Sequence, residues 1–421
     1  MRNPRPALRH LAAPALAALA RAGAPVAARW RRLPERSRRP ALPVLAVALA
    51  ALYPLYLGSL PELPIFGAFP SVNTAVIMLI FTTMALGLNV VVGYAGLLDL
   101  GYVAFYAMGA YTAAWLASSH FAQVTFHVGP VGVGEDQPGI HVSIWLVLIA
   151  AGVLTAIVGI IIGLPTLRLR GDYLAIVTLG FGEIMPQVAR NGDDFFGFNL
   201  TGGAAGINPI DSPGFGTWLN ETAGLPEAYV SAPDGQRLFF WTALALVVLT
   251  AFCSVRLRDS RLGRAWIAIR EDETAAAAMG VPLMRTKTWA YAIGAFFGGV
   301  AGAYYASFKS ATFSEDFFFN ISIFILCMVI LGGMGNVWGV IAGGLFLAYL
   351  DREGLANIGG WMNANLGTSI DVPKYQYMIF GTIIVVVMLF RPQGLFPSGR
   401  RRAELEAGRG ERPGREPETG P

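Results

Sequence analysis

The sequence predicts an all-α membrane protein that crosses the bilayer about ten times, and three observations support this prediction. Of the 421 residues, 54% are hydrophobic and only 14% are charged, whereas roughly 25% of the residues in an ordinary soluble domain are charged. The mean hydropathy is +0.53. The apolar residues form long runs, without the periodic alternation that covers one face of a soluble core. These features exclude a disordered chain, a coiled coil and a soluble enzyme.

The apolar runs define ten candidate spans, because a helix needs roughly 20 apolar residues to cross the hydrocarbon core. They cover residues 41–60, 72–92, 97–117, 143–164, 172–189, 239–255, 288–306, 318–334, 337–350 and 376–390. The ninth run is short and rich in glycine, so we expect it to be tilted, partly buried or re-entrant.

The positions of Lys and Arg predict the orientation of these spans. Four regions hold 26 of the 31 basic residues, namely 1–40, 165–171, 256–287 and 391–421. Ten crossings place all four regions on one side, which the positive-inside rule makes cytoplasmic, together with both termini. The loops 118–142 and 191–238 then face outward, and they hold eight acidic residues against a single basic one, Arg237.

The same pattern divides the chain into three parts. Residues 1–40 form a basic cytoplasmic or interfacial arm that anionic lipid would attract. Residues 41–395 form the transmembrane domain, which includes the cytoplasmic loop 256–287. Residues 396–421, rich in Arg, Glu, Gly and Pro, are expected to be a disordered cytoplasmic tail.

The residues that carry chemistry in enzymes are scarce. Cys253 and Cys327 both lie inside apolar runs, and the four histidines form no H-E-x-x-H pair. None of the three lysines stands in a P-loop. We therefore expect no catalytic residue, metal, cofactor or nucleic-acid partner, and any nucleotide hydrolysis that this chain depends on must occur in another protein.

Loop 256–287 is too polar to span a membrane, but residues 264–280 are predicted to form a helix. Six alanines and no Pro or Gly lie in 264–279, and Gly280 followed by Pro282 is typical of a helix end. The helix would have an apolar side with Trp266, Ile267 and Ile269, and a charged side with Arg270, Glu271 and Asp272. Two alternatives follow: the helix docks into a groove of a soluble partner, or it lies on the membrane surface.

This loop resembles the coupling loop of permease subunits in ATP-binding-cassette importers. The resemblance is carried by Gly263-Arg264-Ala265, Ile269-Arg270-Glu271, Ala275-Ala276 and Met279-Gly280. The motif is of the EAA type, here in a diverged form, because Thr274 separates Glu273 from the alanines. The resemblance implies ATPase-coupling roles for Arg264, Arg270, Glu271, Glu273, Ala275, Ala276 and Gly280.

Four further motifs resemble the LivM-type permeases of branched-chain amino acid importers, over about residues 72–395. They are the stretches from Asn89 to Thr112, from Leu167 to Ile184, from Leu200 to Ile207 and from Ile330 to Gly339. The resemblance implies a bacterial inner-membrane protein with a second permease subunit, two cytoplasmic ATPase subunits and an extracytoplasmic substrate-binding protein. Similar subunits also serve importers of urea, amides and other small organic acids, so the substrate stays open.

Polar side chains within the apolar spans are candidates for a translocation pathway, because such groups usually face a bundle interior or an aqueous cavity. They are Asn89, Asp99, Thr178, Glu183 and Asn336. For each of them a hydrogen bond to a neighbouring helix is the alternative. Asp99 is expected at a helix N-terminus, where the dipole favours a carboxylate, and Glu183 is expected near mid-membrane.

Two other functions compete with the importer subunit. An ion-coupled secondary transporter of a small polar solute would use intramembrane acids such as Glu183, although no internal repeat is visible. An integral membrane enzyme would need clustered His, Asp, Glu or Cys side chains, and the histidines are scattered. The coupling-loop pattern favours the importer.

Overall fold

The structure is a computed structural model that describes residues 35–57, 69–128, 138–169, 171–195, 197–212, 235–367, 370–391 and 394–395. Most of the predicted N-terminal arm and the whole predicted C-terminal tail lie outside these residues. The chain divides into two compact units, residues 1–58 and 59–421. The described part of the first unit contains the helix α2 (Glu35–Tyr56), which begins within the region predicted as an arm.

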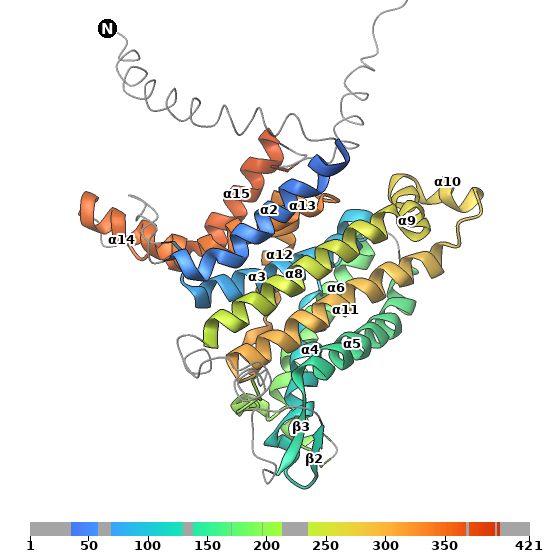
Figure 1. Ribbon diagram of the computed structural model, residues 1–421. Helices are drawn as coiled ribbons and strands as arrows, with labels where there is room; N and C mark the ends of the chain where they lie inside the picture. Colours follow the sequence, from blue (N-terminus) through green and yellow to red (C-terminus); the bar gives the residue numbers. More distant parts are fainter. Residues whose placement is uncertain are drawn as a thin grey trace, which may run out of the picture. The chain divides into compact units, whose positions relative to one another are not determined.

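The second unit is a helical bundle, and its centre is formed by four elements. They are α3 (Val72–Leu88) with its π-helical extension η2 (Asn89–Tyr94), α4 (Val103–Leu116), α5 (Ile144–Thr166) and α11 (Leu283–Lys309). Helix α11 packs against α3, α4 and α5 (Figure 1). Glycines allow this packing: a Cβ at Gly109 of α4 would overlap the backbone of Gly299 of α11, and a Cβ at Gly302 would overlap the carbonyl of Tyr106.

The other long helices of this unit pack on these four elements or on one another. They are α6 (Asp172–Arg190), α8 (Gly235–Asp259), α12 (Phe319–Gly332), α13 (Val337–Tyr349) and α15 (Gln376–Phe390). After α13 the helix does not end at residue 350 as predicted. It continues through the π-helical turn η8 (Leu350–Gly354) into α14 (Leu355–Leu366), and the short 3-10 helix η9 (Val372–Tyr375) leads into α15.

The two ends of the bundle differ. One end carries a small sheet with strand order β1-β3-β2, where β3 (Gly139–Val142) pairs antiparallel with β1 (Ala117–Ser118) and parallel with β2 (Thr125–Val128). The other end carries α9 (Arg261–Glu271) and α10 (Glu273–Ala278) (Figure 1). Helix α11 runs between these ends, and its 27 residues correspond to about 40 Å of helix.

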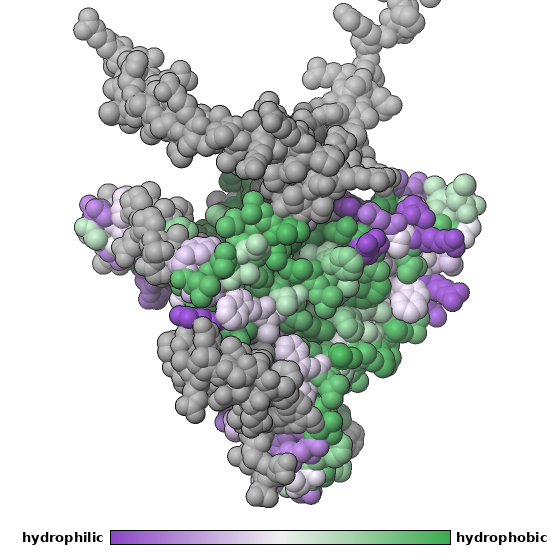
Figure 2. Space-filling view, viewed as in Figure 1, coloured by the Kyte–Doolittle hydropathy of each residue, from purple (hydrophilic) through white to green (hydrophobic). Residues whose placement is uncertain are grey.

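Among the described helices, four are long and apolar enough to cross a membrane by length and composition alone. They cover Val72–Tyr94, Ile144–Thr166, Gln236–Asp259 and Val372–Phe390, and shorter apolar helices cover Pro43–Tyr56, Val103–Leu116 and Phe319–Gly332. Figure 2 shows hydrophobic side chains over the middle of the face formed by α5, α8 and α11, and hydrophilic side chains at the end with α9 and α10. The chain is therefore a polytopic, mostly helical membrane protein.

Candidate functional site

The polar segment between α8 and α11 forms two helices, so the prediction of one helix over 264–280 is wrong. Ser260 caps α9 by accepting a hydrogen bond from the Gly263 amide. The helix ends at Asp272, which adopts an extended conformation and caps α10 by accepting hydrogen bonds from the amides of Thr274 and Ala275. A short aspartate side chain competes with the helical backbone in this way.

The apolar side of α9 faces its own bundle. Trp266 and Ile269 are buried, and the Trp266 indole Nε1 donates a 2.8 Å hydrogen bond to the Thr286 carbonyl at the start of α11. Glycine is required at position 263, in the first turn of α9, because a Cβ there would overlap the carbonyls of Leu257 and Arg258. This apolar side therefore anchors α9 to α11, and it is available neither to a soluble partner nor to lipid.

Arg270 connects α9 to the π-helical end of α3. Its guanidinium Nη1 donates a hydrogen bond to the Gly93 carbonyl in η2, 177 positions away in the sequence. A cation at this place stabilises the negative end of the helix dipole. The side chain passes over Gly96, which has a φ of +69° and where a Cβ would lie 2.7 Å from the Arg270 Cγ. Gly96 is thus needed for its backbone conformation and for the space that Arg270 fills.

Asn89 and the turn before α13 complete this junction. The Asn89 Oδ1 accepts a 2.8 Å hydrogen bond from the Gly335 amide, and Gly93 lies directly beside both groups. Asn336 caps α13 by accepting a hydrogen bond from the Trp338 amide. The sequence left two roles open for Asn89 and Asn336, a translocation pathway or a hydrogen bond, and in the structure the side-chain oxygen of each accepts a hydrogen bond from a backbone amide.

An ion pair joins α10 to α11. The Lys287 Nζ lies 2.8 Å from the Glu273 Oε1, and the lysine side chain is only 4% exposed while the glutamate is 31% exposed. A buried ammonium needs such a partner, because an unpaired charge away from water is costly. Glu273 therefore positions α10 on the bundle.

The tip of the segment is open. Ala275, Ala277 and Ala278 are exposed, Ala276 is buried, and the Met279 side chain is 86% exposed. Gly280 follows with a φ of +83° and has no atoms near its missing Cβ. The tip therefore exposes an apolar methionine side chain next to three exposed alanines.

The other predicted coupling residues lie on the solvent side of α9. Arg264 is exposed and its Nη1 donates a 3.0 Å hydrogen bond to the Asp259 carbonyl. Glu271 is exposed as well. The structure thus divides the seven predicted residues: Arg270, Glu273 and Ala276 hold the segment on the bundle, and Arg264, Glu271, Ala275 and Gly280 face outward.

Asp99 and Thr178 are buried and have local hydrogen bonds. Asp99, which was expected at a helix N-terminus, lies in the turn four residues before the start of α4, and its Oδ1 accepts a 2.9 Å hydrogen bond from the Gly101 amide. Its side chain is only 1% exposed. The Thr178 hydroxyl oxygen accepts from the Leu100 amide and donates to the Ala175 carbonyl. Both residues fix the loop that leads into α4.

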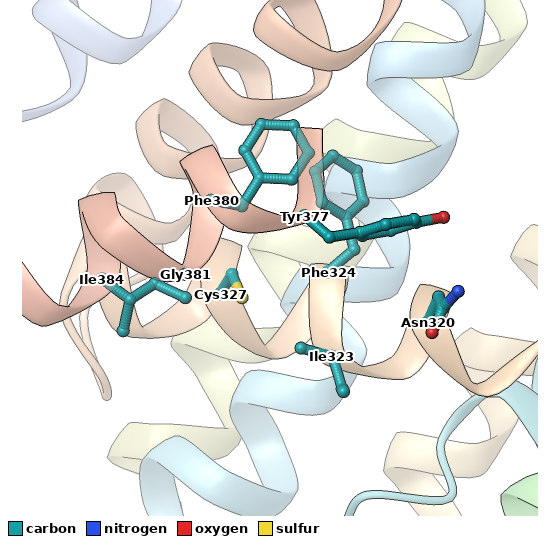
Figure 3. A pocket seen from close by; sticks show the side chains of 8 residues that line it. All are labelled: Asn320, Ile323, Phe324, Cys327, Tyr377, Phe380, Gly381 and Ile384. Atoms are coloured by element: carbon teal, nitrogen blue, oxygen red, sulfur yellow. The ribbon is translucent and has the colours of Figure 1, made fainter. Parts of the chain in front are cut away.

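A groove of about 210 Å³ lies between α12 and α15. Figure 3 shows the side chains that line it, which are Asn320, Ile323, Phe324, Cys327, Tyr377, Phe380, Gly381 and Ile384. None of these side chains is charged, so the groove offers no ionic partner for the ammonium and carboxylate groups of an amino acid.

One acidic residue in the predicted outer loops is not solvated, and the sequence did not indicate this. The Asp211 Oδ2 lies 2.7 Å from the His141 Nδ1, and both side chains are buried. Burial raises the pKa of the Asp211 carboxyl, and the hydrogen bond with His141 opposes this rise. His127 stacks on His141 at 5.0 Å between ring centroids. Because the helices α5 and α6 lie between β3 and residue 211 in the sequence, only the fold brings the pair together.

A bundle of apolar helices with a polar two-helix segment packed into one end defines an integral membrane protein. The chain belongs to the family described as "Branched-chain amino acid transport system / permease component", whose family model matches residues 71–388. It is 38% identical over 348 residues to the high-affinity branched-chain amino acid transport system permease protein LivM of Escherichia coli K12, with 80% of this chain and 72% of the relative covered.

More distant relatives include both kinds of permease subunit. The probable branched-chain amino acid transport permease protein LivM of Methanocaldococcus jannaschii is 26% identical, with 76% of this chain and 90% of the relative covered. The permease protein LivH of Salmonella typhimurium LT2 is 24% identical, with 77% and 92% covered. No solved structure matches the chain.

Proposed function

We propose that this chain is the transmembrane permease subunit of an ATP-driven importer that moves branched-chain amino acids into the cytoplasm. The family and the names of its relatives support this substrate class. The observation that carries the proposal is the two-helix segment α9–α10, whose Arg270 binds the end of α3 while its tip with Met279 is exposed. Such a segment can transmit movement of an outside partner into the bundle.

The partner at this tip is a cytoplasmic ATPase subunit. When two such subunits close around ATP, a shift of α10 passes to α11 through the Glu273–Lys287 ion pair and to α3 through Arg270. Access to the pathway would alternate as these helices move. This chain contributes positioning and movement, and the ATPase subunits supply the free energy.

The remaining assembly follows from the family. A second, related permease subunit pairs with this chain, as the similarity to both LivM and LivH proteins suggests. A substrate-binding protein docks on the opposite end, and the complex lies in the bacterial inner membrane with ten crossings and both termini in the cytoplasm. The distribution of basic residues supports this orientation.

Met279→Asp tests the coupling role. Met279 is exposed, so the substitution leaves the fold intact but places a charge on an apolar contact surface. We expect at least tenfold less ATPase subunit to co-purify with the tagged chain in mild detergent, and a matching loss of ATP-driven leucine uptake in proteoliposomes. Gly280 and Glu273 are less suitable positions, because their substitution would also disturb the fold. Gly280 has a positive φ, and Glu273 forms the ion pair with Lys287.

Val124→Asp is the matched control, because Val124 is 52% exposed at the other end of the bundle. This variant should keep the ATPase subunits bound. Normal leucine uptake by the Met279→Asp complex would contradict the coupling assignment. Leucine uptake that is insensitive to ATP depletion but depends on an ion gradient would contradict the proposal of an ATP-driven importer.

A further inference from the structure

Helix α6 has one buried side and one exposed side. Its buried residues include Leu174, Ala175, Thr178, Gly182 and Pro186, and this side packs on the loop around Gly101, where a Cβ would overlap the Thr178 carbonyl. The exposed side includes Tyr173, Ile176, Glu183, Ile184, Gln187 and Val188. At 100° per residue these exposed positions fall within about 140° of one another, so they form one continuous strip.

Glu183 lies in the middle of this strip. It is eleven residues after the start of α6, or about 16 Å along the axis, so it cannot reach either interface easily. No described residue forms a hydrogen bond or an ion pair with its carboxylate, and α6 is not among the described helices that are apolar enough to cross lipid unaided. A carboxylate exposed at this depth is expensive in hydrocarbon. The strip therefore faces water or another protein.

The surroundings of Glu183 match the three parts of a branched-chain amino acid. Its carboxylate complements an ammonium group. Gln187, one turn further along the helix and exposed, has an amide that can donate to a carboxylate. Gly180 lies on the same strip with no atom within 4 Å of its missing Cβ, and Ile176 and Ile184 border that space with exposed apolar surface. An aliphatic side chain fits there.

We infer that this strip of α6 lines the translocation path opposite the second permease subunit, and that Glu183 binds the ammonium group of the passing amino acid. The inference rests on the proposed function and adds a contact site to it. It also separates Glu183 from three other polar candidates, because the side chains of Asn89, Asp99 and Thr178 are buried and each accepts a hydrogen bond from a backbone amide. A transient contact of this kind needs no deep pocket, since the solute must leave again.

The first test uses the isosteric variant Glu183→Gln in the complete complex reconstituted with its binding protein. We expect leucine uptake to fall at least tenfold while the ATPase subunits still co-purify, because the side chain touches the solute and not the coupling segment. Glu315→Gln is the matched control: Glu315 is an exposed carboxylate in η7 (Ser314–Phe317), and its variant should transport normally.

The second test does not depend on transport by the Glu183 variant. Gln187→Cys, in a background with Cys253→Ser and Cys327→Ser, should react with a water-soluble maleimide, and leucine supplied with ATP and the binding protein should slow the reaction. Ile157→Cys on the exposed apolar side of α5 is the control that should resist this reagent.

The outcomes separate the two claims. Normal uptake by Glu183→Gln, or reaction of Gln187→Cys with a lipid-soluble reagent alone, would overturn the inference and leave the importer function standing. A wild-type complex that binds its ATPase subunits but moves no branched-chain amino acid would overturn the proposed substrate. Loss of uptake in Glu183→Gln together with leucine-sensitive labelling at residue 187 would establish the contact.

Discussion

Single residues hold the segment α9–α10 on the bundle, and Lys287 at the start of α11 is one of them. Its ammonium is almost fully buried, and Glu273 from α10 is its ion-pair partner. Removal of one partner of a buried pair leaves an uncompensated charge, whereas removal of both leaves an apolar contact that can be nearly neutral. The sequence suggested Glu273 as a contact for the ATPase, but its position indicates a structural role that comes before any such contact.

Glu273→Gln should therefore destabilise the protein by roughly 1–3 kcal/mol, less than for a fully buried pair, because Glu273 is 31% exposed. The double variant Glu273→Gln with Lys287→Met should recover most of the loss. Thermal or chemical unfolding in detergent measures the change in the free energy of unfolding for both variants. Asp371→Asn breaks the exposed pair with Lys374 and serves as the control, with an expected change within about 0.5 kcal/mol. Equal losses in the single and double variants would show that the pair contributes nothing.

At the scale of elements, the sequence predicted the positions of the long helices well, because apolar runs of this length have few alternatives. Within the described residues, a helix occupies most of each of the ten predicted segments. The errors occur where short polar or charged side chains decide the local backbone conformation. Asp272 caps α10 and so divides the segment between α8 and α11 into two helices. The charged run Asp351-Arg352-Glu353 continues as a π-helical turn, beyond the predicted end of the span at residue 350. The contact between Arg270 and Gly93 was beyond sequence reasoning, because hydropathy does not indicate which distant helix end a side chain meets.

The crossing of α4 and α11 depends on glycine, and Gly302→Ala tests it. The added methyl group would overlap the Tyr106 carbonyl, which belongs to a backbone that cannot rotate away. We expect a loss of about 1–3 kcal/mol in unfolding free energy. Gly381→Ala in α15 is the matched change, since no atom lies within 4 Å of its missing Cβ, and it should be neutral or stabilising by up to about 1 kcal/mol. A similar effect of both variants would contradict tight packing at Gly302.

For the molecule as a whole, the bundle has two chemically distinct ends. The β-sheet and the buried His141–Asp211 pair lie at one end, and α9 and α10 lie at the other. Loop 256–287 is one of the four regions that hold 26 of the 31 basic residues, so we propose that the end with α9 and α10 faces the cytoplasm.

This orientation predicts opposite labelling of two exposed positions. In the background without Cys253 and Cys327, a membrane-impermeant thiol reagent should reach Val124→Cys in intact cells and Met279→Cys only in inverted membrane vesicles. Both side chains are exposed in the wild type, so neither substitution disturbs packing. Labelling of both positions from the same side would refute the predicted topology.

The π-helical turn η2 links the contact with Arg270 to the register of helix α3. A π turn holds one residue more than an α turn. If this turn rewound into a regular α-helix, the residues beyond it would advance by about 1.5 Å and rotate by about 100° around the axis. The Arg270 guanidinium donates its hydrogen bond to Gly93 within this turn. Movement of α9 away from the bundle would break this bond and remove one restraint on the register of α3.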